Sequence, residues 1–113
     1  FDDVKDNFTI MKEEPFGPLV PILTFKNFDE VMKRANDNDL GLCSYVYTTD
    51  LKKANEASEI LETGCVAVNT PAVAVAEAPF GGIKQTGYGR EGGSMAIKDY
   101  LNIKYTHFGI SYE

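Results

Sequence analysis

The sequence has few cysteine and histidine residues. Its 113 residues include two cysteines, Cys43 and Cys65, which form no C-x-x-C pair, and one histidine, His107. A disulfide scaffold and a zinc site are therefore not expected, and we predict no bound metal ion. The same pattern favours a reducing compartment such as the cytoplasm.

Positive charge and long hydrophobic runs are scarce as well. Lysine and arginine number 11 against 17 acidic residues, which gives a formal net charge of −6. Nucleic acid is not an expected partner, because phosphate binding needs concentrated positive charge. No apolar run approaches the roughly 20 residues of a membrane span, so no membrane partner is expected. The acidic start Phe1-Asp2-Asp3 is unlike a signal peptide and indicates a processed chain or a fragment.

Glycine, in contrast, is concentrated in one window. Six glycines lie between Ala78 and Gly93, in the stretch A-P-F-G-G-I-K-Q-T-G-Y-G-R-E-G-G. Such density is typical of a shaped loop that needs positive φ or close backbone approach. The loop also carries Phe80, Lys84 and Arg90. It is either a wall of a functional site or a buried structural crossing between two elements.

The hydrophobic pattern predicts an α/β fold. Apolar runs indicate strands over Leu19–Phe25, Leu42–Tyr47 and Cys65–Val68, and the short run Phe8–Met11 could be a further strand. Helices are expected between the three longer strands. This order predicts a parallel βαβαβ layer with right-handed crossovers, in a chain long enough for one modest domain or part of one.

Capping residues place the two helices. Asn27 is a plausible N-cap for the first, whose apolar face is formed by four residues spaced at helical intervals: Phe28, Val31, Met32 and Ala35. Thr49 or Asp50 caps the second helix, which stops at Gly64. Its predicted apolar face contains Leu51, Ala54, Ser58 and Leu61.

The carboxyl end of the last predicted strand is the expected place for a ligand. Ligands of parallel sheets gather at the carboxyl ends of the strands. Asn69 leaves the Cys65–Val68 strand at that edge, so the following stretch Pro71–Phe80 should lie near any active site. Further on, Ser94–Tyr100 is a weak helix candidate. Residues Tyr100–Ile110 alternate apolar and polar side chains, which predicts a strand that pairs with another subunit or another part of the protein.

Several motifs, in this order and spacing, resemble the C-terminal quarter of an aldehyde dehydrogenase. They are Glu13-Glu14-Pro15-Phe16-Gly17-Pro18, the Asn36–Gly41 turn, the Gly64–Asn69 strand, Pro79-Phe80-Gly81-Gly82-Ile83-Lys84 and Gly87-Tyr88-Gly89-Arg90-Glu91. The tail D-Y-L-N-I-K-Y is most similar to the succinate-semialdehyde dehydrogenase branch. The resemblance implies that residues 1–99 form the C-terminal part of an incomplete catalytic domain. Residues 100–113 would then be an oligomerisation strand and tail, which makes a homo-oligomer.

The resemblance also implies a reaction and a cofactor. Aldehyde dehydrogenases use NAD or NADP to oxidise an aldehyde to an acid: a cysteine thiolate adds to the carbonyl, hydride passes to nicotinamide, and water hydrolyses the thioester. Glu14 matches the glutamate that holds the nicotinamide ribose hydroxyls, and Phe16 the ring beside that ribose.

Two further positions match the substrate side of the family's site. Phe80 matches a residue that lines the aldehyde tunnel, and Ala74 a position that sets specificity. Succinate-semialdehyde dehydrogenases commonly have a serine at the position of Ala74. A buried substrate carboxylate that loses this hydrogen bond is destabilised by about 1.5 to 3 kcal/mol.

The chain lacks the family's reactive groups. It has no F-x-x-x-G-Q-x-C stretch, no nucleotide-binding glycine loop of the family and no upstream general-base glutamate. Cys43 and Cys65 fall inside predicted strands, where a thiol is normally inert. We therefore expect the chain to contain no catalytic residue and to be inactive alone. The alternatives are a non-enzymatic assembly module that pairs through its terminal strand, and an oxidoreductase of related fold that reduces activated acyl groups.

Overall fold

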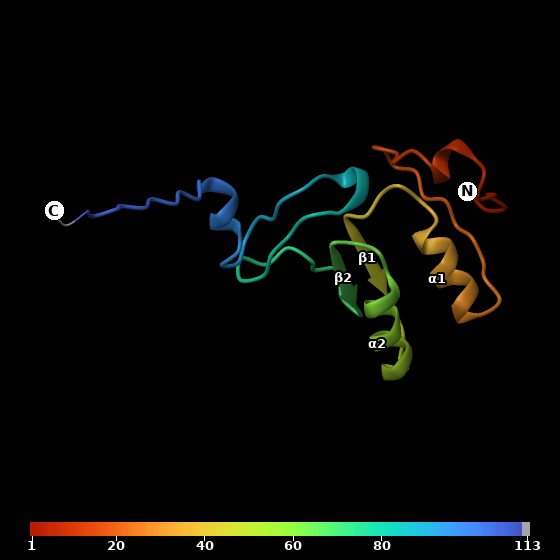
Figure 1. Cartoon of the computed structure of the whole chain (residues 1–113). Helices are drawn as coiled ribbons and strands as arrows, with labels where there is room; N and C mark the ends of the chain where they lie inside the picture. The colour runs from red at the N-terminus through yellow and green to blue at the C-terminus, as the bar shows by residue number, and fades with distance from the viewer. Residues whose placement is uncertain (112–113) are drawn as a thin grey trace.

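The structure is a computed structural model that describes residues 1–111. A βαβ unit forms its centre: β1 (Cys43–Val46) leads into α2 (Leu51–Ile60), which leads into β2 (Cys65–Val68). Helix α1 (Phe28–Asn36) precedes this unit, and short 3₁₀ helices span Thr9–Met11, Lys84–Thr86 and Ala96–Tyr100. The molecule is elongated, about 81 × 33 × 25 Å, because the C-terminal residues run away from the βαβ unit (Figure 1).

The sheet confirms the parallel topology but not the number of strands. Strands β1 and β2 pair in parallel, with Cys43 opposite Cys65 and Val46 opposite Val68. The described part of the chain has two strands rather than the predicted three. Residues Leu19–Phe25 form no strand. Pro21 removes one ladder donor from this stretch.

A contact with the first residue replaces the missing strand pairing. The amino group of Phe1 donates to the Val20 carbonyl (3.0 Å), and the Ile22 amide donates to the Phe1 carbonyl (2.9 Å). The strand considered for Phe8–Met11 is also wrong, because Thr9–Met11 is a 3₁₀ helix. Both N-terminal segments lie beside the βαβ unit without joining its sheet (Figure 1).

Both helices begin where their capping residues predict. The Asn27 side-chain oxygen accepts a hydrogen bond from the Glu30 amide (2.9 Å) and starts α1. Asp50, not Thr49, caps α2, and its carboxylate accepts from the amides of Lys52 (3.0 Å) and Lys53 (3.2 Å). These bonds satisfy amides that would otherwise have no partner at a helix start.

The core of the described residues is small. Met32, Ala57 and Leu61 form it, and four side chains pack against it: Phe28, Val31, Val46 and Val66. The predicted face of α1 is thus confirmed for three of its four residues, since Ala35 is exposed. The predicted face of α2 is confirmed for Ala54 and Leu61, which are buried, but is wrong for Leu51 and Ser58, which are exposed. Ala57, which was not predicted, is completely buried.

The terminal residues are extended but unpaired. After the 3₁₀ helix Ala96–Tyr100, which agrees with the weak helix candidate, residues 101–111 form no strand and lie away from the βαβ unit (Figure 1). A strand requires a neighbour, and within residues 1–111 no other segment pairs with residues 101–111. The predicted oligomerisation strand over 100–113 therefore stays a prediction, and residues 112 and 113 lie outside the described part. Among the described helices, none is long and apolar enough to span a membrane.

Candidate functional site

The glycine-rich loop docks on the turn that follows α1. The Gly41 carbonyl accepts hydrogen bonds from the amides of Gly64 (2.9 Å) and Ile83 (3.0 Å), and the Gln85 amide donates to the Asp39 carbonyl (2.9 Å). Backbone hydrogen bonds thus join two segments that are about forty residues apart in sequence. The predicted loop is confirmed as a fixed structure rather than a flexible linker.

Close backbone approach explains the glycines on the inner side of this loop. A Cβ atom at Gly64 would collide with the Gly81 carbonyl oxygen, and one at Gly82 would collide with the Thr86 hydroxyl. Gly87 and Gly89 have φ values of 108° and 81°, which side chains rarely tolerate. Glycine is therefore required by close backbone approach at the first two positions and by positive φ at the last two.

Lys84 fastens the loop to the end of α1. Its ammonium donates to the carbonyls of Asn36 and Asn38 (3.1 Å each) and pairs with the Glu62 carboxylate (2.8 Å). A cation is favourable at the C-terminus of a helix, where carbonyl groups lack partners. Lys84 has φ of 55°, an unfavourable region for a residue with a side chain, so these contacts hold a strained backbone in place.

Arg90 and Phe80 shape a small cavity on the far side of the loop. Arg90 Nη1 donates to the carbonyls of Gly82 (2.9 Å) and Gly89 (2.7 Å), and its amide donates to the Asp99 carboxylate (2.8 Å). Phe80 and Glu91 form an antiparallel bridge. The cavity, of about 250 Å³, is lined by half-buried Phe80 together with Arg90 and with Tyr88 and Tyr100.

The carboxyl ends of the strands are held together by one side chain. Asn69 has φ of 56°, and its side-chain amide exchanges two hydrogen bonds with the backbone of Thr48, each 2.9 Å long. Residues 70–79 leave this edge as irregular chain, in which Ala74 is exposed. This stretch connects the sheet edge to Phe80, and its predicted place near an active site stays a prediction.

Glu14 and Phe16 lie on another irregular segment, after the first 3₁₀ helix. Phe16 is 96% exposed, and exposed Glu14 forms no hydrogen bond or ion pair within residues 1–111. Neither residue lines the cavity that contains Phe80. The described residues therefore do not bring the two halves of the predicted site together. A carboxylate such as that of Glu14 can accept hydrogen bonds from both hydroxyls of a vicinal diol, so its predicted contact with a ribose stays a prediction.

The cysteines lie side by side at the start of the two strands. Burial raises the pKa of the Cys43 thiol, and the neighbouring Cys65 raises it further. The Cys65 thiol contacts the Gly81 carbonyl at 3.8 Å. A raised pKa disfavours the reactive thiolate, which agrees with the predicted inertness of Cys43. His107 is exposed and bonded to the Tyr105 hydroxyl (3.2 Å).

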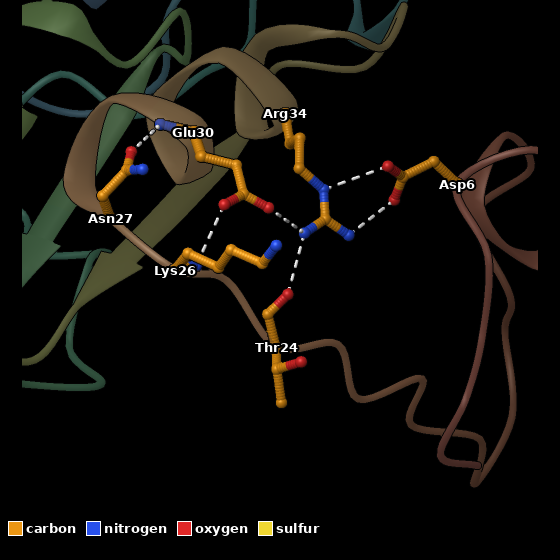
Figure 2. Close-up of polar contacts among 6 residues, drawn as sticks. All are labelled: Asp6, Thr24, Lys26, Asn27, Glu30 and Arg34. Carbon is orange, nitrogen blue, oxygen red and sulfur yellow. Dashed lines mark hydrogen bonds and ion pairs between the residues drawn. The ribbon is translucent and has the colours of Figure 1, made fainter.

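Sequence reasoning missed Arg34. Its guanidinium contacts Asp6, Thr24 and Glu30 (Figure 2). Asp6 and Arg34 are 28 positions apart, so no local sequence signal identifies the pair. Charge identity alone cannot indicate which of many acids an arginine meets.

Comparisons with known proteins agree with these features. The sequence profile described as "Aldehyde dehydrogenase family" matches residues 1–106. A succinate-semialdehyde dehydrogenase [NADP(+)] of Escherichia coli is 46% identical over 108 residues, 96% of this chain and 22% of the relative. Retinaldehyde dehydrogenase 3 of Rattus norvegicus is 51% identical over 104 residues, 92% of this chain and 20% of the relative.

A solved structure has the same fold over most of the chain. It is an NAD+ complex of an aldehyde dehydrogenase from Bacillus cereus, with a TM-score of 0.88 and 44% sequence identity. The match covers 91% of this chain and 21% of the solved chain. The chain thus spans about one fifth of the length of the proteins that it matches.

Proposed function

We propose that this chain, which belongs to the aldehyde dehydrogenase family, supplies the C-terminal part of the catalytic domain of an enzyme that oxidises an aldehyde to an acid. The observation that carries this proposal is the family match over residues 1–106. Because the chain spans about one fifth of its relatives, the nucleophilic cysteine and the general base would lie on other parts of the protein. Residues 1–113 alone would be inactive.

The cofactor of the intact enzyme is NAD or NADP in this proposal. Glu14 would accept hydrogen bonds from the nicotinamide ribose hydroxyls, and Phe16 would offer a flat apolar face beside the same ribose. Their exposure and lack of partners within residues 1–111 support this role. The bound cofactor would accept a hydride from the substrate. The chain's own contribution is to hold and orient the ribose.

A semialdehyde such as succinate semialdehyde is the proposed substrate. Similarity to a relative that carries this name supports the choice. Phe80 would line the path of the aldehyde, which its half-buried position in a cavity supports. Ala74 would set specificity from the exposed stretch between β2 and Phe80. With no hydroxyl at position 74, other residues of the intact protein would hold the substrate's distal carboxylate.

Homo-oligomerisation through residues 100–113 is also part of the proposal. Ile103 and Tyr105 are 102% and 84% exposed, which supports a role for this segment in contact with another surface. The family match favours an enzyme over a free-standing assembly module. The two unpaired thiols support a location in the cytoplasm.

The test is an assay of the intact protein with succinate semialdehyde and either NAD+ or NADP+, followed by the absorbance of the reduced cofactor. Glu14→Gln should raise the KM for the cofactor about tenfold, as expected for the loss of one charge-assisted contact. Glu13→Gln is the matched control, because Glu13 is the neighbouring exposed acid. Turnover by the 113-residue chain alone, or none by the intact protein with any aldehyde, would contradict the proposal.

A further inference from the structure

Arg34, near the end of α1, joins three parts of the chain. Its Nε and Nη2 atoms donate to the Asp6 carboxylate (3.0 and 2.8 Å), and its Nη1 atom donates to the Thr24 carbonyl (2.9 Å) (Figure 2). Glu30, one turn earlier on α1, lies 3.4 Å from the same Nη1. The paired bonds to Asp6 fix direction as well as distance, because the guanidinium is planar.

Arg34 is itself held on a rigid support. Glu30 binds Arg34 through one carboxylate oxygen and accepts from the Lys26 amide (2.9 Å) through the other. The Glu30 amide in turn donates to the Asn27 cap. Figure 2 shows these residues as one connected network that runs along α1 from its N-cap to Arg34. The position of the guanidinium is therefore set by the helix and its cap.

The two ends of one segment meet at this guanidinium. Asp6 precedes residues 7–23 and Thr24 follows them, and this segment carries Glu14 and Phe16. Within residues 1–111, every hydrogen bond that joins residues 1–25 to later residues is donated by Arg34.

A cavity separates part of the same segment from the end of α1. A cavity of about 760 Å³ lies between the N-terminal segment and the end of α1, lined by Asp6, Met11 and Lys12 on one side and residues 34–39 on the other. Because this space separates the two sides, the hydrogen bonds of Arg34 are the described polar ties between the N-terminal segment and α1.

We propose that Arg34 is a positioning residue that holds the segment carrying Glu14 and Phe16 in place for cofactor binding. This inference rests on the proposed function, in which those two residues contact the nicotinamide ribose. Arg34 does not touch the cofactor. Releasing one end of the segment lets Glu14 sample other positions, so that binding must first order the chain.

The experiment uses the intact protein with Asp6→Asn and Arg34→Lys. Asp6→Asn keeps the side-chain shape and removes the charge. Arg34→Lys keeps the charge and removes the pair of guanidinium N–H donors that bind Asp6. Each should raise the KM for NAD(P)+ about tenfold, while kcat and the KM for the aldehyde change less than about threefold. Combining the two substitutions should add little, because both act on one contact.

Direct binding of the reduced cofactor, followed by fluorescence, provides a second readout that needs no turnover. It should rank the variants in the same order. Lys52→Gln is the matched control, since it removes an exposed ion pair with Glu56 (3.6 Å) on α2, outside the N-terminal segment. It should leave both cofactor binding and activity unchanged.

Glu14→Gln separates the two levels of the proposal. If Glu14→Gln weakens cofactor binding and Asp6→Asn does not, the inference about Arg34 is wrong and the proposed function stands. If Glu14→Gln has no effect, the cofactor role of Glu14 is wrong, and the inference fails with it. Equal changes in kcat and in both KM values for Asp6→Asn and Arg34→Lys would indicate general damage and also overturn the inference.

Discussion

At the scale of single residues, Gly64 is the position where a small change should have a large effect. Gly64→Ala places a methyl group against the Gly81 carbonyl, and backbone cannot move aside as a side chain could. We expect the intact protein to lose about 1 to 3 kcal/mol of stability, the range for overpacked sites. Chemical denaturation would measure the loss.

Gly17→Ala is the control for that substitution. No atom lies within 4 Å of a Cβ built at Gly17, and its φ is not in the left-handed region. Its stability should change by less than about 0.5 kcal/mol, as for ordinary surface substitutions. Equal effects of the two alanines would show that the loop does not dock on Gly64 as described.

The Cys43 thiol should react slowly. Burial and the neighbouring Cys65 raise its pKa, so a smaller fraction is thiolate at neutral pH than for a free thiol. Alkylation of Cys43 by iodoacetamide at pH 8 should be several-fold slower than that of glutathione, and should accelerate as the pH rises. Peptide mass spectrometry would follow it. A rate equal to that of glutathione would contradict the described environment.

At the scale of elements, the helix caps carry the next predictions. Asn27→Ala removes the hydrogen bond to the Glu30 amide and should destabilise α1 by about 1 kcal/mol, as for other N-cap deletions. Asn27→Asp, which keeps an acceptor oxygen, should cause a much smaller loss. Thermal unfolding of the intact protein would compare them, and equal losses would exclude capping as the cause.

Asp50 should make the stability of α2 depend on pH. The backbone amide of Lys53 is the main cause of its lowered pKa, with a further bond from Lys52. The folded state therefore favours the carboxylate. This contribution is present above the unfolded carboxyl pKa of about 3.9 and is lost as the pH falls through the lower folded pKa.

Asp50→Asn tests that pH dependence, because asparagine caps a helix without titrating. The stability difference between the parent protein and Asp50→Asn should shrink as the pH falls below about 4. A constant difference across this range would show that Asp50 does not cap α2 as a carboxylate.

Local chemistry made the βαβ unit and α1 predictable. Asn27 and Asp50 mark the starts of α1 and α2, because their side chains accept hydrogen bonds from amides two or three residues later. The apolar runs that form β1 and β2 are short, with polar or turn residues at their ends. The failure at Leu19–Phe25 has a different origin, because an apolar run becomes a strand only when another strand supplies partners. Within residues 1–111, the backbone of this stretch bonds to Phe1 and to the Arg34 side chain, and to no strand. The Asp6–Arg34 pair was not predictable because its members meet through tertiary structure alone.

At the scale of the whole molecule, little of the apolar surface is covered. Ala57 is the most deeply buried core residue, whereas Phe16, Ile103 and Phe108 are 96%, 102% and 83% exposed. So small a core offsets little of the conformational entropy lost on folding. We expect the isolated 113-residue chain to show no cooperative thermal transition and to bind a dye for exposed apolar surface. A sharp transition in a monomer would contradict this.

The candidate site falls into two separate parts of the molecule, one around Phe80 and one around Glu14 and Phe16. The motifs around Phe80 predict a shaped glycine-rich loop, and the structure confirms it. The loop is bonded to the turn after α1, and its glycines are required by close contacts within the chain. Glu14 and Phe16 point to a contact that no described residue provides. The site roles of Glu14, Phe16, Ala74 and Phe80 therefore stay predictions, because residues 1–111 do not bring the two halves together.

The order β1, α2, β2 also bears on how the chain reaches its structure. The two strands pair across a single intervening helix, so the stretch of chain between paired residues is shorter than the stretch between Gly41 and Ile83. Contacts of low sequence separation form early, because little chain entropy is lost before they form. The crossover is thus suited to act as the folding nucleus, onto which the Gly41–Ile83 docking condenses later.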